Sequence, residues 1–377
     1  MVKKILVFLG LSLLTWPLAW ADDDHARFPR DASFTTLITT PLAIEGLTGD
    51  HHGNLYTTGR NAGNGVSCPV WRVSPADPEP RLLVVGFVPA PTPTTQCSPS
   101  GIAFNSSGDL FFSDNDRVLT LTPNASTPPT AIPYATGVPG TNGLAFDRDG
   151  NLWTGDGTTG QGRVWKIPPG GGAGVEMFRV QPVLNPVSVG RDIRTVPTGN
   201  SQPLVANGVA FTHGGDLLIA DTARGAIWKV EMDRYGDIRG RTGCDTTFAD
   251  NTLCLENIFV THPLAEGADG IALDEGGNIW IAANERNAIV AVTREGRTAE
   301  VFRNAPSAAT RLRNEGPLET PTSPFLLGHK FCTANSDGNR RDNVPNTAGE
   351  IKPAGPGVGK ISCMDQLLKI PGMRLPL

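Results

Sequence analysis

The sequence predicts an all-β fold: a six-bladed β-propeller with four-stranded antiparallel blades, its ring closed by the N-terminal strand. One motif recurs along most of the chain, and each copy has the pattern of a β-hairpin. The composition agrees, because 44 Gly and 32 Pro in 377 residues favour strands joined by many turns, and helical heptads are absent.

The repeated motif has two glycines seven residues apart, followed by Asn or Asp and then an apolar pair. Five copies share this spacing, with glycine pairs at positions 46/53, 101/108, 143/150, 208/215 and 270/277. In the third copy, GLAF (143–146) is the short apolar run expected of a strand buried on both faces. The second glycine and its Asn or Asp are expected to supply the positive-φ residues of a tight turn, after which a return strand and a third strand follow.

A hairpin unit that recurs every 42 to 65 residues predicts the blades of a propeller. A shorter copy, TSPFLLGHKFCTAN (322–335), is expected to begin the sixth blade, which GKISCMDQLLKI (359–370) continues and FTTLITTP (34–41) completes. Because the last strand comes from the N-terminal side, it closes the ring and removes an exposed sheet edge. Five or seven blades are the alternatives if the shorter copy is not a blade.

The chain begins with MVKKILVFLGLSLLTWPLAWA (1–21): two lysines, an apolar run and small residues, the pattern of a signal peptide cleaved after Ala21. We therefore expect a tail at 22–33, the propeller at 34–377, and a secreted or periplasmic protein with no membrane contact after cleavage. The alternative, a membrane anchor, needs a longer apolar run.

Six cysteines, an even number without a CxxC pair, fit an oxidising compartment. Proximity in the sequence suggests the pairs Cys68–Cys97, Cys244–Cys254 and Cys332–Cys363, one of the fifteen connectivities that six cysteines allow. A net charge of −5 and a pI near 5.7 give no basic footprint, so neither nucleic acid nor an anionic membrane is expected as a partner. The oligomeric state stays open.

The residue before each first glycine enters the innermost strand of its blade, so all copies place it at one mouth of the channel. These residues are Glu45, Ser100, Asn142, Asn207 and Asp269, with Ser323 expected as the sixth. Converging oxygens, two of them from carboxylates, without Cys or His indicate a site for a hard cation, Ca²⁺ before Mg²⁺ or Mn²⁺, with Zn²⁺ a further candidate. The alternative is that small polar residues in Asn-Gly and Asp-Gly dipeptides only cap the backbone.

The order and register of these segments resemble the senescence marker protein/gluconolactonase family, which includes regucalcin. The resemblance runs from IEGL (44–47) through NGLAFDRDGNLW (142–153), NGVAF (207–211) and DGIALDEGGNIWIA (269–282) to LETPTSP (318–324). It covers nearly the whole chain after residue 21 and implies a six-bladed propeller. It also implies that Glu45, Asn207 and Asp269 hold a metal ion, and that Asn142 lies near the substrate and the metal.

Two features depart from the family pattern. Blade one lacks the Pro that usually follows the Glu, and Thr141-Asn142 replaces an Arg-Asn-Asp arrangement of regucalcin-like members. The expected metal ligands are retained despite these departures, but sugar lactones become less expected as substrates.

The resulting hypothesis is an exported, metal-dependent hydrolase, a lactonase or esterase that acts on a small lactone at the channel mouth. Asp269 is expected to be metal ligand and general base, and Glu45 mainly a ligand. Asn142 and Asn207 would orient the substrate carbonyl, while Ser100 and Ser323 line the substrate site. Two alternatives stay open: a binding or scaffold propeller with a structural cation, and a non-metal propeller resembling strictosidine synthase, in which an acidic residue replaces the ion.

Three long, non-repetitive stretches, 170–204, 232–266 and 303–321, each precede a residue of the mouth and are expected to emerge on that face and cover it. His262, in the second stretch, is interpreted as a loop residue.

Three aspartates, Asp114, Asp156 and Asp221, recur at one register after the second strand of their copies. They are interpreted as caps on the next turn rather than as site residues.

Overall fold

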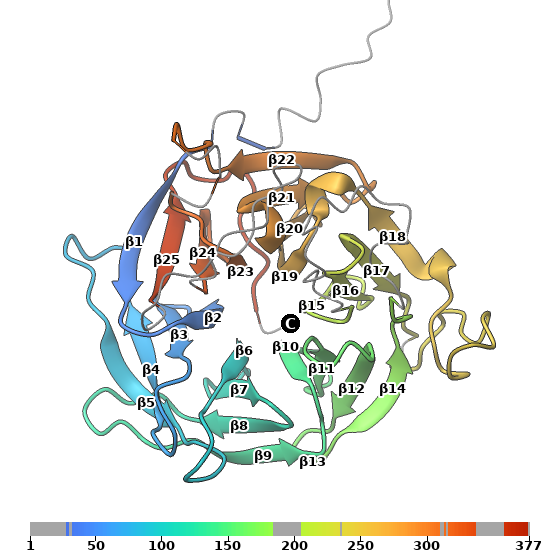
Figure 1. The fold of residues 1–377 in the computed structure, drawn as a ribbon, viewed down its shortest axis with the longest axis horizontal. Helices are drawn as coiled ribbons and strands as arrows, with labels where there is room; N and C mark the ends of the chain where they lie inside the picture. Colours follow the sequence, from blue (N-terminus) through green and yellow to red (C-terminus); the bar gives the residue numbers. More distant parts are fainter. Residues whose placement is uncertain are drawn as a thin grey trace, which may run out of the picture.

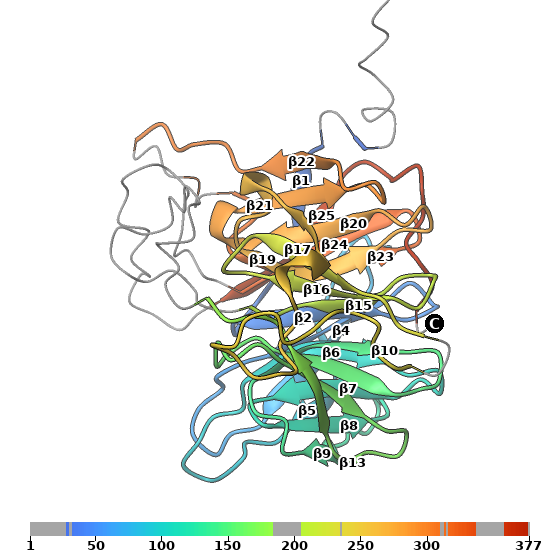
Figure 2. The same ribbon diagram turned by 90° about the vertical axis from the view of Figure 1, so that its right-hand side faces the viewer.

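The computed structural model describes residues 28–29, 32–183, 205–233, 236–309, 313, 316–336 and 358–375. Six sheets of antiparallel strands stand around a central axis, which confirms the six-bladed propeller (Figure 1). Seen from its edge, the ring has strands that run along the axis (Figure 2). The expected signal peptide at 1–21, with its cleavage after Ala21, lies outside the described residues.

Each of the first three blades runs outward from an inner strand at the channel. Blade one contains β2 (Ile44–Gly49), β3 (Leu55–Gly59), β4 (Cys68–Val73) and β5 (Leu83–Val88). Blade two contains β6 (Pro99–Phe104), β7 (Leu110–Asp114), β8 (Arg117–Leu121) and β9 (Ile132–Thr136), to which the short β13 (Gly172–Ala173) adds in parallel. Blade three contains β10 (Thr141–Phe146), β11 (Leu152–Asp156), β12 (Arg163–Ile167) and β14 (Val175–Arg179).

The next two blades repeat this order. Blade four contains β15 (Val209–Phe211), β16 (Leu217–Asp221), β17 (Ala226–Val230) and β18 (Ile258–Thr261). Blade five contains β19 (Ala268–Leu273), β20 (Ile279–Ala283), β21 (Ala288–Val292) and β22 (Thr298–Arg303). In the described residues, three short 3-10 helices lie in connections: η3 (Leu255–Asn257), η4 (Pro263–Ala265) and η5 (Asn284–Arg286). No helix in the described part of the chain has the length and apolar character needed to cross a membrane.

Blade six joins the two ends of the chain, as the sequence predicts. β23 (Pro321–Leu327), β24 (Lys330–Asn335) and β25 (Gly359–Met364) are followed by β1 (Phe34–Thr40) as the outer strand. β1 pairs with β25 in antiparallel register, so the N-terminal strand closes the ring.

All three suggested disulfides are present. Cys68–Cys97 joins β4 to the connection between β5 and β6, Cys332–Cys363 joins β24 to β25, and Cys244–Cys254 fastens the connection between β17 and β18.

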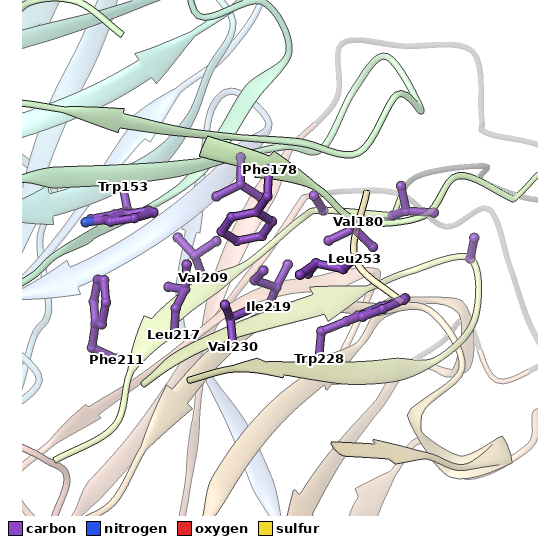
Figure 3. Close-up of a cluster of buried hydrophobic side chains, with 14 of the residues drawn as sticks. Trp153, Phe178, Val180, Val209, Phe211, Leu217, Ile219, Trp228, Val230 and Leu253 are labelled. Atoms are coloured by element: carbon purple, nitrogen blue, oxygen red, sulfur yellow. The ribbon is translucent and has the colours of Figure 1, made fainter. Parts of the chain in front are cut away.

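The core lies between blades rather than at the axis. In the described residues the buried apolar side chains form six clusters, each at the interface of two neighbouring blades. Between blades three and four, Trp153 and Phe178 face Val209, Ile219 and Trp228 (Figure 3). The apolar strands are therefore buried on both faces, because each blade is covered by a blade on either side.

The hairpin turns confirm part of the turn prediction and correct the rest. The second glycine of each copy has φ between 77° and 92°, the left-handed region that glycine adopts without strain. The Asn or Asp after it has no positive φ. In blade three, Asn151 instead donates from its backbone and its amide to Asp147, which also accepts from Trp153 Nε1 at 2.8 Å.

Two of the three recurrent aspartates, Asp156 and Asp221, cap the next turn as expected, whereas Asp114 accepts from the backbone of Ser98; all three also pair with an arginine. Asp156 accepts from the backbone N–H of Thr159 and from Arg163 Nε, both at 2.9 Å. Asp221 accepts from the backbone and guanidinium of Arg224, both at 2.8 Å. The buried aspartates thus join the turn to the third strand.

The long stretches do not all lie where the sequence led us to expect. β18 divides the stretch 232–266, and the part before it starts at the far end of β17, near the hairpin turns. That part runs along the outside of the ring, where Thr252 bridges to Arg179. Only residues 262–266 lie beside the mouth, because the blade-four turn reverses the chain direction before β18. Residues 184–204 of the first stretch lie outside the described residues, whereas the third stretch starts on the mouth side, where β22 ends at Arg303.

The first glycine of each copy is needed for a different reason from the second. The inner strands approach so closely that a β-carbon at Gly208 would stand 2.5 Å from the carbonyl oxygen of Asp269 and 2.8 Å from Gly270 Cα. The same holds at Gly46, Gly101, Gly143 and Gly270, whose missing β-carbons each face backbone of the next blade. We call these five residues the glycine waist.

Replacing Gly208 by alanine is expected to lower the free energy of unfolding by about 3 kcal/mol, because rigid backbone on the neighbouring strand would have to move. Chemical denaturation of the purified variant measures this. Gly214→Ala is the matched control, since its β-carbon would meet nothing closer than 3.5 Å. Equal stability of the two variants would contradict the close packing of the waist.

Candidate functional site at the mouth of the channel

The five residues before the waist glycines lie together at one end of the inner strands. They are buried polar side chains, with exposed fractions between 2% for Asn207 and 9% for Glu45. We call Glu45, Ser100, Asn142, Asn207 and Asp269 the mouth ring. Figure 1 shows the inner strands β2, β6, β10, β15 and β19 that carry or follow these residues around the centre.

The sixth position of the mouth ring belongs to Thr322 rather than Ser323. Pro321 pairs with Asn335 at the register where Ala268 pairs with Ala283, so Thr322 corresponds to Asp269. Ser323 stands where the other blades have the waist glycine. Thr322 Oγ1 donates to the carbonyl of Glu45 at 2.7 Å and so joins blade six to blade one. The shortened turn of this copy explains the shift of one residue.

A second set of residues supports the mouth ring from the start of the next connection. Each stands fifteen positions after its mouth-ring residue: Arg60, Asn115, Gly157, Thr222 and Asn284. We call this set the supporting ring. The sequence analysis missed it, although the constant spacing was available as a signal. Because the residue types vary, the spacing alone does not say what the position does.

Thr222 determines the orientation of the Asn207 amide. The Thr222 hydroxyl donates its single proton to the carbonyl of Ala268 at 2.7 Å, so towards Asn207 it can only accept. Asn207 therefore presents Nδ2 to Thr222, at 3.0 Å. Its Oδ1 is buried and has no hydrogen-bond partner within the described part of the chain. A buried oxygen left in this way needs an explanation, and an ion or a water molecule at the mouth would supply one.

Asn142 and Asn207 converge at Gly157, a supporting-ring glycine. A β-carbon at Gly157 would stand 2.7 Å from Asn142 Nδ2 and 2.9 Å from Asn207 Oδ1. Glycine thus leaves open the space between two amides that come from different blades.

Asp269 is fixed by Asn284, whose Nδ2 donates to Oδ2 at 2.8 Å. Burial raises the pKa of the Asp269 carboxyl to about 7, and the nearby Glu285 adds to the rise. The hydrogen bond from Asn284, the charge of Arg60 and the amide of Asn207 oppose this rise in pKa. Asp269 in blade five is therefore within electrostatic reach of Arg60 in blade one, across the mouth.

Arg60 forms an ion pair with Glu45, through Nη1 and Oε2. Its Nη2 also donates to Ser98 Oγ at 2.8 Å. Arg60 thus links Glu45 of blade one to the segment that enters blade two, two residues before Ser100. That Glu45, Asn207 and Asp269 share one ion stays a prediction.

The oxygens at the mouth suit a hard cation better than a soft one. The described residues contain no group of three or more His, Cys, Asp or Glu that could hold a metal, so a site here depends on amide oxygens as well as carboxylates. Asn207 Oδ1 supplies such an oxygen, and Asp269 a carboxylate whose burial without a cation disfavours its charged form. On these observations the residues fit a divalent cation. His262 has another role, since its Nδ1 accepts from the N–H of Leu264 at 3.1 Å and caps η4.

A family model described as the SMP-30/Gluconolactonase/LRE-like region matches residues 70–312, more than half of the chain. The chain belongs to this family. No curated protein matches it.

Several solved structures have the same fold over nearly the whole of this chain. A luciferin-regenerating enzyme has a TM-score of 0.57 at 15% identity, with 91% of this chain and 98% of that one covered. A calcium-binding regucalcin from Agrobacterium tumefaciens has a TM-score of 0.56 at 17% identity, with 90% and 95% covered. A gluconolactonase from Xanthomonas campestris has a TM-score of 0.52 at 14% identity, with 93% and 92% covered. At these identities the likeness shows the fold.

Replacing Thr222 by valine should lower the free energy of unfolding by about 1–3 kcal/mol, because the Asn207 amide and the Ala268 carbonyl both lose a buried partner. Thermal or chemical denaturation measures the loss. Thr222→Ser keeps the hydroxyl and should restore most of the stability. If the valine variant is as stable as the serine variant, Thr222 does not fix the amide.

Proposed function

We propose that this protein is an exported, divalent-cation-dependent hydrolase that opens a small lactone or ester at the mouth of the propeller. Glu45, Asn207 and Asp269 hold the cation, with Ca²⁺ the first candidate because the donors are all oxygens. Asn142 and Ser100 line the substrate side. Ser323 has the weaker claim, because Thr322 stands at its expected position.

One observation carries the proposal: the buried Oδ1 of Asn207 has no partner in the described residues and lies beside Asn142, while the amide nitrogen of the same residue faces Asp269. The polar groups of the mouth ring come from five blades, and no backbone pairing requires them to be polar. A fold that only needed caps at these positions would satisfy its buried amides internally.

Family membership supports the same reading. The family description includes gluconolactonase, and two structural neighbours are described as a gluconolactonase and as a calcium-binding protein. The three disulfides support export, because such bonds persist in oxidising compartments.

The residues at the mouth have separable tasks. A bound divalent cation supplies Lewis acidity and stabilises negative charge that develops on a carbonyl oxygen. The Asn142 amide, which lies next to Asn207, donates to the substrate carbonyl and orients it. Asp269, held in place by Asn284, accepts the proton of the attacking water. The buried position of the mouth ring limits access of other water molecules.

Removal of the cation should abolish hydrolysis while the propeller stays folded, because three disulfides and six core clusters do not involve the mouth. Elemental analysis of the purified protein, paired with a panel of lactones and aryl esters before and after chelation, measures both properties. Activity that returns on adding Ca²⁺ supports the proposal. A tightly retained ion without turnover of any substrate indicates instead a scaffold with a structural cation, and unchanged hydrolysis after complete chelation indicates the non-metal mechanism.

Asp269→Asn should lower kcat/KM for the best lactone by at least about 100-fold, because the amide can neither accept a proton nor balance the cation's charge. Asp149→Asn is the matched control: it makes the same chemical change at an exposed turn at the other end of blade three and should leave kcat/KM unchanged. A fall of less than about tenfold, with the fold and metal content intact, would remove Asp269 from the mechanism.

A further inference from the structure

The supporting ring contains one charged residue. Asn115, Gly157, Thr222 and Asn284 are neutral at the register that Arg60 occupies in blade one. The fold therefore does not demand a cationic side chain at this position.

Arg60 lies where a positive charge acts on the carboxylates of the candidate cation site. It forms an ion pair with Glu45, through Nη1 and Oε2, and its charge also reaches Asp269, two blades away around the mouth. The Arg60 and Glu45 side chains are 22% and 11% exposed, so water screens their attraction only in part.

A divalent cation that binds Glu45 and Asp269 uses the negative charge that the guanidinium compensates, and it is repelled by the guanidinium's positive charge. The Arg60 guanidinium and the divalent cation therefore compete for Glu45 and Asp269, and binding of one disfavours binding of the other. Each should weaken the binding of the other by the same factor.

We propose that Arg60 competes with the divalent cation for Glu45 and Asp269 and thereby lowers the affinity of the mouth for the ion. This inference rests on the proposed function, because it assigns the cation to those residues. Arg60 acts as an internal counter-ion that holds Glu45 in place and keeps the pair of carboxylates compensated until the ion arrives. It must leave Glu45 when the ion binds, while its Ser98 contact keeps it beside the mouth.

The test is a calorimetric titration of the full-length, chelator-treated protein with calcium chloride. Arg60→Gln removes the charge and should lower the Kd for Ca²⁺ by about 5- to 150-fold. Arg60→Lys keeps the charge but loses the forked geometry, so its Kd should fall between those of Arg60→Gln and the wild type. Lys229→Gln breaks an ion pair with Asp216 at the hairpin-turn end of blade four, away from the mouth, and should leave the Kd unchanged.

Thermal unfolding gives a second readout that does not depend on activity. Without calcium, Arg60→Gln should unfold at a lower temperature than the wild type, since Glu45 and Asp269 lose their compensating charge. Saturating calcium should raise its Tm by more than it raises that of the wild type. If Arg60 only stabilised the fold, its removal would leave Ca²⁺ binding equal or weaker. An equal or higher Kd in both Arg60 variants would overturn the proposal, and the lysine variant decides the matter if the glutamine variant does not fold.

The pattern also separates this inference from the proposed function. Equal affinity in wild type and variants, with calcium-dependent hydrolysis, would overturn the competition alone. Calcium binding by Arg60→Gln but not by the wild type would support the competition and contradict a calcium requirement of the native enzyme. Absence of calcium binding from all variants, together with absence of lactone hydrolysis, would overturn both.

Discussion

The structure depends on the close approach of its inner strands at the glycine waist. At five positions a side chain would collide with backbone of the next blade, and the contacts are to carbonyl oxygens and α-carbons that cannot move aside on their own. Glycine here is required by space and not by backbone dihedrals, because none of the five has a positive φ. The waist therefore sets how tightly six blades can surround one axis.

The candidate site follows from the same constraint. Because each waist glycine touches the backbone of the next mouth-ring residue, the side chains just before the glycines are brought to one place and buried. Polar groups in such a position need partners, and the supporting ring supplies most of them: Thr222 to Asn207, Asn284 to Asp269, and Arg60 to Glu45. What the supporting ring leaves unsatisfied, above all Asn207 Oδ1, is what a ligand can use. The position of the site therefore follows from the close packing of the inner strands, and a few supporting-ring residues determine which of its polar atoms lack a partner.

The repeat made the architecture predictable, because one spacing in five copies specifies hairpins, blades and closure at once. The N-terminal closing strand and the three disulfides were predicted from sequence position and are present. Errors arose where the repeat is broken. In blade six the hairpin turn is shorter, so the mouth position falls on Thr322 and not on Ser323. The sequence pattern cannot show at which point of the hairpin the missing residue is lost. The turn Asn and Asp residues were assigned positive φ, whereas they bind the aspartate or its equivalent at the start of the turn.

The chemistry at the mouth was less predictable than the fold. The motif placed the mouth ring in one region, but it could not show which amide oxygen is left over, because that depends on a proton which Thr222 gives to Ala268. It also could not show the role of Arg60, because its charge reaches Asp269 only once blade six brings blades one and five around the same mouth. The connection that contains Cys244 and Cys254 was expected over the mouth but lies on the outside, because the strand after it carries the chain back.

The central claim is that oxygens of three blades share one ion at the channel mouth. Anomalous diffraction from crystals in which a lanthanide replaces calcium tests it most directly. The account predicts one strong peak at the centre of the mouth ring, with oxygens of Glu45, Asn207 and Asp269 within about 2.3–2.6 Å of it. A map without a peak there, or with these three side chains pointing to separate places, would contradict it.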